Sequence, residues 1–135
     1  MNRQMGNGSL LFEEAPFLIA TASVVGTKEK QGPLGPMFDE TLEDDKYGQQ
    51  TWEEAESALQ HRALYLALQK SGLDKEMLRY IIAGDLLGQT IASSFGLMDY
   101  KIPLFGIYGA CSTSGEGLSL GAMTVAAGYA DYLAV

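Results

Sequence analysis

Short apolar runs alternate with helical segments along the carboxyl-terminal part of the sequence, and this alternation restricts the fold more than any other feature. The runs are rich in β-branched and aromatic residues, which is typical of buried strands. Strands that alternate with helices pair in parallel and carry the helices packed on the sheet, so the sequence predicts an α/β fold. The predicted strands are residues 80–83, 104–108 and 131–135, and the predicted helices are residues 51–71, 86–96 and 112–128.

The helix of residues 51–71 has the clearest end signals. Thr51 and Glu54 have the spacing of a capping box, which satisfies two backbone N–H groups that a helix leaves free. Gly72 follows as a left-handed cap. Asp74 is expected to cap a short helix that extends to Arg79. One apolar face recurs at helical spacing, and it comprises Trp52, Ala55, Leu59, Ala63, Leu66 and Ala67, with Leu64 and Leu68 beside it.

The residues before this helix are less regular. Residues 10–12 and 17–25 predict two short strands around a turn. Residues 27–50 form a loop region that is rich in glycine and proline at first and acidic later. We expect the acidic series to be a solvated face, and the alternative is a loop that binds a cation or a partner.

Composition excludes several classes of function. Seventeen acidic and nine basic residues give a net charge of -8, and no basic stripe is present, so nucleic acid is not an expected partner. A single cysteine, Cys111, forms no internal disulfide, and with one histidine it does not make a zinc site. Residues 1–11 lack a signal-peptide pattern, and no uncharged run reaches the roughly 18 residues of a membrane span.

Cys111 follows a predicted strand and precedes a predicted helix. Ligands bind at this edge of open α/β sheets, and free N–H groups of a first helical turn favour a thiolate or an anion. We expect Gly109 to allow a sharp turn, and Ser112, with the two residues after it, to cap the helix or bind a ligand. Glu116 opposes thiolate formation by its charge. From these residues alone, a buried structural cysteine is the alternative.

Two other polar residues are candidates for a site. Asp85 follows the predicted strand of residues 80–83, so a place in a pocket is conceivable, although capping the next helix is the simpler role. His61 sits off the central apolar stripe of its helix, and we expect a surface histidine rather than a catalytic base.

Several short blocks resemble, in order and spacing, the stage V sporulation protein AD family of the thiolase superfamily. A cysteine at the start of a long helix of small residues is also the nucleophile arrangement of thiolases and ketoacyl synthases. The resemblance extends from Leu10 onward. The blocks are residues 12–13, 28–35, 38–39, 83–89, 101–103 and 109–114.

The resemblance implies a thiolase-like α/β fold of αβαβα layers, of which residues 1–135 are the amino-terminal part, the first half only and incomplete. It also implies a protein that binds dipicolinic acid, with calcium as a conceivable companion, for uptake of calcium dipicolinate into the developing spore. The family's ligand site corresponds to Cys111, and Gly109, Ala110, Ser112 and Asp85 are neighbouring candidates. No cofactor and no resident metal are expected.

Two alternatives remain open. A condensing enzyme or acyltransferase would use Cys111 as its nucleophile with a histidine base, for which His61 is poorly placed. A purely structural role would use the fold for assembly. The resemblance further implies a homodimer, membrane proteins of the same sporulation stage as partners, and a forespore or spore location, soluble or peripheral at the inner spore membrane.

Overall fold

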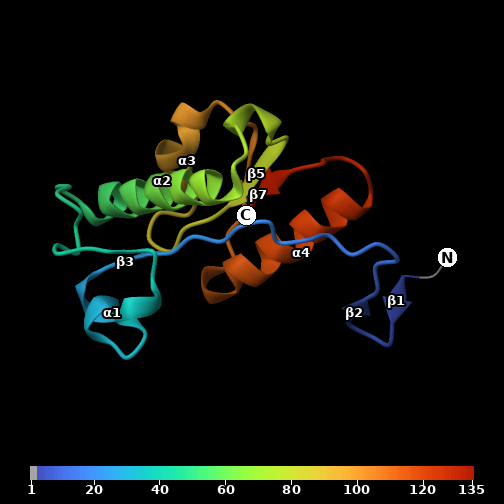
Figure 1. Ribbon diagram of the computed structural model, residues 1–135, viewed down its shortest axis with the longest axis horizontal. Helices are drawn as coiled ribbons and strands as arrows, with labels where there is room; N and C mark the ends of the chain where they lie inside the picture. The colour runs from blue at the N-terminus through green and yellow to red at the C-terminus, as the bar shows by residue number, and fades with distance from the viewer. Residues whose placement is uncertain (1–2) are drawn as a thin grey trace.

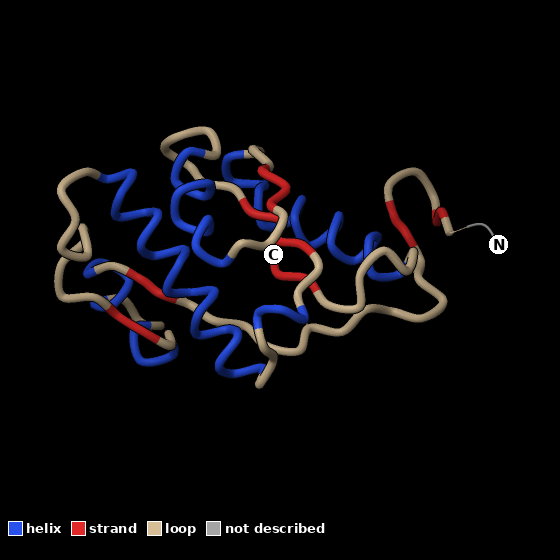
Figure 2. The backbone as a smooth tube through the Cα atoms, turned by 90° about the horizontal axis from the view of Figure 1, so that it is seen from above, coloured by secondary structure: helices blue, strands red, loops and turns tan. Residues whose placement is uncertain are grey.

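The computed structural model describes residues 3–135, and residues 1 and 2 of the polar amino-terminal segment lie outside the described part. Helices and strands alternate around a small sheet, with a separate hairpin at the amino-terminal end (Figures 1 and 2). The strands are β1 (Gln4–Met5), β2 (Ser9–Leu10), β3 (Val24–Val25), β4 (Glu40–Thr41), β5 (Tyr80–Ala83), β6 (Leu104–Gly106) and β7 (Leu133–Ala134). The helices are α1 (Thr27–Gln31), α2 (Trp52–Ser71), α3 (Ile91–Leu97) and α4 (Thr113–Ala126), with short 3-10 turns at Gly35–Met37, Lys75–Met77, Met98–Tyr100 and Ala110–Ser112.

A three-stranded parallel sheet in the order β6-β5-β7 forms the centre of the molecule. Successive residues of β5 point to opposite faces, and both central ones are buried: Ile81 is 2% exposed and Ile82 is 3% exposed. Ile81 lies in a core cluster with Leu97 and Tyr100, against which α2 packs. Ile82 lies beside Gly117 of α4. The sheet therefore has helices on both faces, and the predicted α/β fold is confirmed.

The end signals of α2 act as the sequence predicts. The Thr51 hydroxyl accepts a hydrogen bond from the Glu54 amide at 3.2 Å, and the Glu54 carboxylate accepts one from the Thr51 amide at 3.0 Å. Gly72 ends the helix at φ 69°, a left-handed conformation that glycine adopts without steric cost. The same helix reaches the core through Leu64 and Leu68.

Small residues let α4 approach the sheet closely. A Cβ on Gly117 would lie 2.6 Å from Val135 Cγ1, and a Cβ on Gly121 would lie 3.0 Å from Val135 Cγ2. The helix ends at Ala126, shortly before Gly128, where the sequence predicts its end. Close packing of α4 on β7 and β5 is therefore a direct consequence of its glycines.

The amino-terminal strands differ from the prediction. Only Val24 and Val25 of residues 17–25 form a strand, and Phe17 is 89% exposed. Residues 10–12 contribute only Leu10, which pairs in the β1–β2 hairpin. A strand persists only where a neighbour completes its hydrogen bonds, and β5 already pairs with β6 and β7.

Three other elements also differ. The helix predicted at residues 86–96 begins only at Ile91, because the two preceding residues, Gln89 and Thr90, take left-handed backbone conformations with φ 51° and 78°. Asp74 makes no side-chain cap, and residues 75–77 form a 3-10 turn. The strand β6 is an edge strand, so Phe105 is 54% exposed where a buried strand was predicted.

Residues 27–50 contain α1, a 3-10 turn and β4, which pairs in parallel with β3. Acidic side chains hold this segment to α2: Asp39 forms an ion pair with Lys70 at 2.8 Å, and Glu40 forms one with Arg62 at 2.7 Å. The guanidinium of Arg62 holds the pKa of Glu40 below its ordinary value. Asp45 accepts a hydrogen bond from the Thr27 amide at 2.6 Å.

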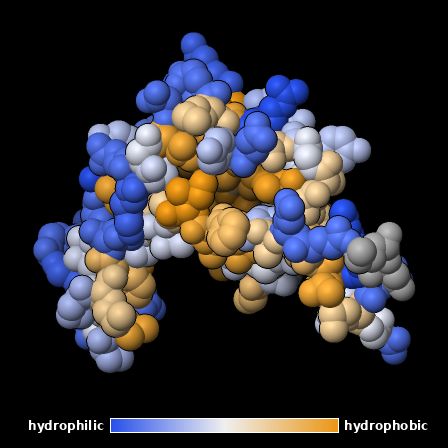
Figure 3. All heavy atoms as spheres, turned by 45° about the vertical axis from the view of Figure 1, so that its right-hand side comes forward, coloured by the Kyte–Doolittle hydropathy of each residue, from blue (hydrophilic) through white to orange (hydrophobic). Residues whose placement is uncertain are grey.

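Apolar side chains remain on the surface in number, and Figure 3 shows them gathered over the middle of one face. Exposed large residues come from the extended segment before β3 and from the region around α3 and β6. They include Phe17, Leu18, Ile19, Leu86, Leu87, Ile91, Phe95, Met98, Phe105 and Tyr108. Surface of this kind is typical of a molecule that packs against further protein.

Candidate functional site: the turn between β6 and α4

The predicted constellation of strand, cysteine and helix is present. Cys111 lies in the 3-10 turn Ala110–Ser112, between the carboxyl end of β6 and the first residue of α4. Its side chain is exposed, so the alternative of a structural cysteine buried in hydrocarbon is wrong. A thiol at this position is accessible to a small molecule.

Gly109 is fixed through both of its backbone groups. Its amide donates to the Thr113 hydroxyl oxygen at 3.1 Å, and its carbonyl accepts from the Ser112 amide at 3.0 Å and the Ser112 hydroxyl at 2.7 Å. A Cβ on Gly109 would clash with Ser112 Oγ and lie 2.8 Å from Glu116 Oε2, so these two side chains would have to shift to make room for it. The predicted sharp conformation is instead found at Ala110, which has φ 49°.

Ser112 does not cap α4 with its side chain, so the first of the two roles expected for this residue is wrong. Its hydroxyl donates back to Gly109, so it closes the turn on the strand side. Glu116 occupies the first turn of α4, where a carboxylate is stabilised by the positive end of the helix dipole. The structure thus brings Gly109, Ala110, Cys111 and Ser112 together in one compact turn.

Asp85 occupies the equivalent end of the neighbouring strand β5 and is only 5% exposed. One carboxylate oxygen accepts from the Thr90 amide at 2.8 Å, and the other accepts from the Ser93 amide and hydroxyl, each at 2.9 Å. Burial alone would raise the pKa of Asp85, but these hydrogen bonds outweigh it and hold the pKa below its ordinary value. Both oxygens are therefore engaged in shaping the loop that leads into α3.

The loop after β5 is also tied to α2 by residues that sequence reasoning missed. Glu56 accepts hydrogen bonds from the amides of Leu86 and Leu87 at 2.9 and 3.4 Å, and Gln60 donates to the Gly84 carbonyl at 3.3 Å. The Tyr108 hydroxyl donates to the Leu86 carbonyl at 3.3 Å, which joins this loop to the chain after β6. Their spacing in the sequence carries no signal, because these contacts form only in the tertiary fold.

His61 is exposed on α2, as predicted, and its ring packs on Tyr100 with ring centroids 5.0 Å apart. Its backbone carbonyl accepts a hydrogen bond from the Tyr100 hydroxyl at 2.9 Å. These contacts explain the position of His61 as part of the α2 surface.

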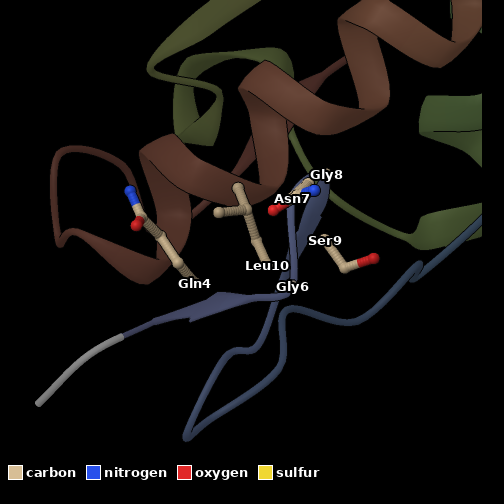
Figure 4. A pocket seen from close by; sticks show the side chains of 6 residues that line it. All are labelled: Gln4, Gly6, Asn7, Gly8, Ser9 and Leu10. Carbon is tan, nitrogen blue, oxygen red and sulfur yellow. The ribbon is translucent and has the colours of Figure 1, made fainter.

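A hollow lies elsewhere, beside the β1–β2 hairpin, and Figure 4 shows its lining side chains. None of the lining residues titrates, so the hollow offers no acid or base; they are Gln4, Gly6, Asn7, Gly8, Ser9 and Leu10. Within residues 3–135, no three His, Cys, Asp or Glu side chains group as metal ligands. None of the helices in this described part is long and apolar enough to cross a membrane.

Comparison with known proteins gives a family for the chain. The sequence profile described as stage V sporulation protein AD matches residues 6–135. The stage V sporulation protein AD of Bacillus subtilis strain 168 is 38% identical over 125 residues, which cover 93% of this chain and 37% of that protein. The chain thus spans less than half the length of this relative. It belongs to the stage V sporulation protein AD family.

Proposed function

We propose that the chain is part of a sporulation protein that binds dipicolinic acid and serves the uptake of calcium dipicolinate into the developing spore. The proposal combines membership of the stage V sporulation protein AD family with one structural observation: an exposed Cys111 at the carboxyl edge of a parallel sheet. The relative's name refers to sporulation, and the ligand is our inference.

The chemistry of the turn suits such a ligand. Dipicolinate is a small planar dianion, and N–H groups at a helix amino terminus donate hydrogen bonds to a carboxylate. Cys111 lies directly before α4, whose first turn contains these groups. Glu116 adds a negative charge nearby, which a calcium ion bound with the ligand would offset.

Calorimetric titration of the full chain with dipicolinate tests this proposal. We expect saturable heat with dipicolinate and weaker binding of picolinate, which has one carboxylate fewer. Cys111→Phe should weaken binding by filling the space above the turn. Ser119→Phe, on the exposed surface of α4, is the matched control and should bind as the parent does. No heat at millimolar dipicolinate, with and without calcium, would reject the proposal.

A condensing or acyl-transfer activity is the second candidate, and the exposure of Cys111 favours testing it. A thiol that is accessible at a helix start could attack a thioester and take its acyl group, releasing the thiol of the donor. Incubation with short acyl thioesters should then add the acyl mass to Cys111, the only cysteine. An unmodified mass would count against this activity.

The assembly of the protein is also a proposal. We expect a homodimer that docks onto membrane proteins of the same sporulation stage, at the inner membrane of the forespore or spore. The exposed apolar side chains around α3 and β6 support a protein contact of this kind. Analytical ultracentrifugation across a concentration series would measure the subunit number.

A further inference from the structure

Thr113, the first residue of α4, touches both strand ends that meet at the candidate site. Its hydroxyl oxygen accepts the Gly109 amide at 3.1 Å, on the β6 side. Its methyl group faces β5, because a Cβ built on Gly84 would lie 2.6 Å from Thr113 Cγ2. One half-buried side chain therefore links the start of the helix to the ends of two neighbouring strands.

The register of the sheet places these two strand ends side by side. Ala83 pairs with Gly106, and the Ile107 amide donates to the Ala83 carbonyl at 3.0 Å, so the ladder continues one residue beyond β6. A side chain at position 84 would strike both the Ile107 carbonyl and the Thr113 methyl group. Gly84 thus leaves the room that Thr113 fills.

We propose that Thr113 is the positioning residue of the Cys111 turn. The turn runs from Gly109 to Thr113, and the hydrogen bond between these two residues closes it around Cys111. Thr113 thereby fixes the thiol relative to the sheet edge and to the first N–H groups of α4. The inference rests on the proposed function for its role in dipicolinate binding, and on geometry alone for its effect on the thiol.

Variants at position 113 separate the hydroxyl from the methyl group. Thr113→Val keeps the shape and removes the acceptor, and Thr113→Ser keeps the acceptor and removes the methyl group. Thr113→Ala is the second variant that lacks the acceptor, for use if valine prevents folding. Thr124→Val is the matched control, because the Thr124 hydroxyl bonds only within α4, to the Leu120 carbonyl at 2.8 Å.

The first measurement is the rate at which iodoacetamide alkylates Cys111 in the folded full chain. We expect Thr113→Val to slow alkylation about threefold or more, because a loosened turn no longer holds the thiol at the helix start. We expect dipicolinate affinity to fall about tenfold, as when one hydrogen bond is lost. Thr113→Ser and Thr124→Val should keep the parent rate and affinity.

The outcomes are distinguishable. A lower Tm for Thr113→Val with the parent alkylation rate and the parent affinity would overturn the inference, because Thr113 would then act on stability alone. Loss of affinity in Thr113→Ser equal to that in Thr113→Val would also overturn it. If the parent protein binds no dipicolinate, the proposed function is wrong. If alkylation is nevertheless slower in Thr113→Val than in the parent, the positioning role of Thr113 still holds.

Discussion

Replacing Asp85 with asparagine separates a structural role of this carboxylate from a role in ligand binding. The two oxygens of Asp85 accept three hydrogen bonds, from the Thr90 amide and from the amide and hydroxyl of Ser93. Asparagine has one acceptor oxygen, so its NH2 group would face a donor at one of these positions. If the oxygen stays with Ser93, the half-buried Thr90 amide is unpaired, which costs about 2 kcal/mol.

A loss of about 2 kcal/mol corresponds to a Tm lower by about 7 °C for a chain of this size. Differential scanning calorimetry of Asp85→Asn measures it, and Asp131→Asn, which removes the same charge from an exposed turn, is the control. Dipicolinate affinity below the Tm should stay within about twofold of the parent, because both Asp85 oxygens are already engaged within the protein. An unchanged Tm with clearly weaker binding would refute this reasoning.

The same carboxylate gives a dependence on pH. The hydrogen bonds from Ser93 and Thr90 hold the pKa of Asp85 below its ordinary value despite its burial. The stabilisation is therefore present above the pKa of an unfolded aspartate, about 3.9, and is lost as pH falls through the lower folded pKa. The difference in Tm between the parent and Asp85→Asn should narrow on acidification below that pH, and a constant difference would contradict the assignment.

Three further predictions concern the scaffold. A Cβ at Gly96 would lie 2.5 Å from a backbone oxygen of α2, so Gly96→Ala should lower the free energy of unfolding by about 3 kcal/mol. Guanidinium unfolding measures this as a lower midpoint, and an unchanged midpoint would show that the two helices are not in close contact there. Thr51→Ala removes the capping box and should cost about 1 kcal/mol in thermal unfolding, and Ser119→Ala, within α4, should not. The guanidinium of Arg62 lowers the pKa of Glu40. Their ion pair therefore stabilises the fold above about pH 4.3, and this stabilisation is lost as pH falls through the folded pKa of Glu40. Unfolding followed by the fluorescence of Trp52, the sole tryptophan, should show this loss of stability on acidification in the parent and not in Glu40→Gln.

The parts of the fold that were predictable have local signals. The capping box and Gly72 set the ends of α2, and both depend on residues within one helical turn of each end. The strands β5, β6 and β7 were predictable because β-branched and aromatic residues cluster between helices. Their parallel pairing was predictable because a helix that connects two strands of one sheet, as a right-handed crossover, leaves them parallel. Their order in the sheet comes from tertiary pairing.

Other parts depend on contacts that sequence spacing does not reveal. Phe17, Leu18 and Ile19 have strand propensity, yet they have large exposed fractions, because propensity without a pairing partner leaves backbone groups to water. Leu87, Ile91 and Phe95 have helical spacing, but the helix begins only at Ile91. The amides of Leu86 and Leu87 donate to the Glu56 carboxylate, which lies thirty residues before Leu86, and Gln89 and Thr90 adopt positive φ.

At the candidate site, the position of Cys111 was predictable and the conformation around it was not. The sequence favours a glycine as the strained residue, whereas Ala110 takes positive φ and Gly109 provides room for Ser112 and Glu116. Adopting the left-handed region costs a non-glycine residue about 1 kcal/mol, which the closed turn must offset. Such strain is common at functional turns, and it is visible only in the structure.

Protection of Cys111 by dipicolinate tests the central claim most directly. Because Cys111 is the only cysteine, mass spectrometry of iodoacetamide adducts follows this one position. If the ligand covers the turn between β6 and α4, alkylation should slow about tenfold at a dipicolinate concentration ten times its Kd. An alkylation rate that is the same with and without dipicolinate would contradict a ligand site at this turn.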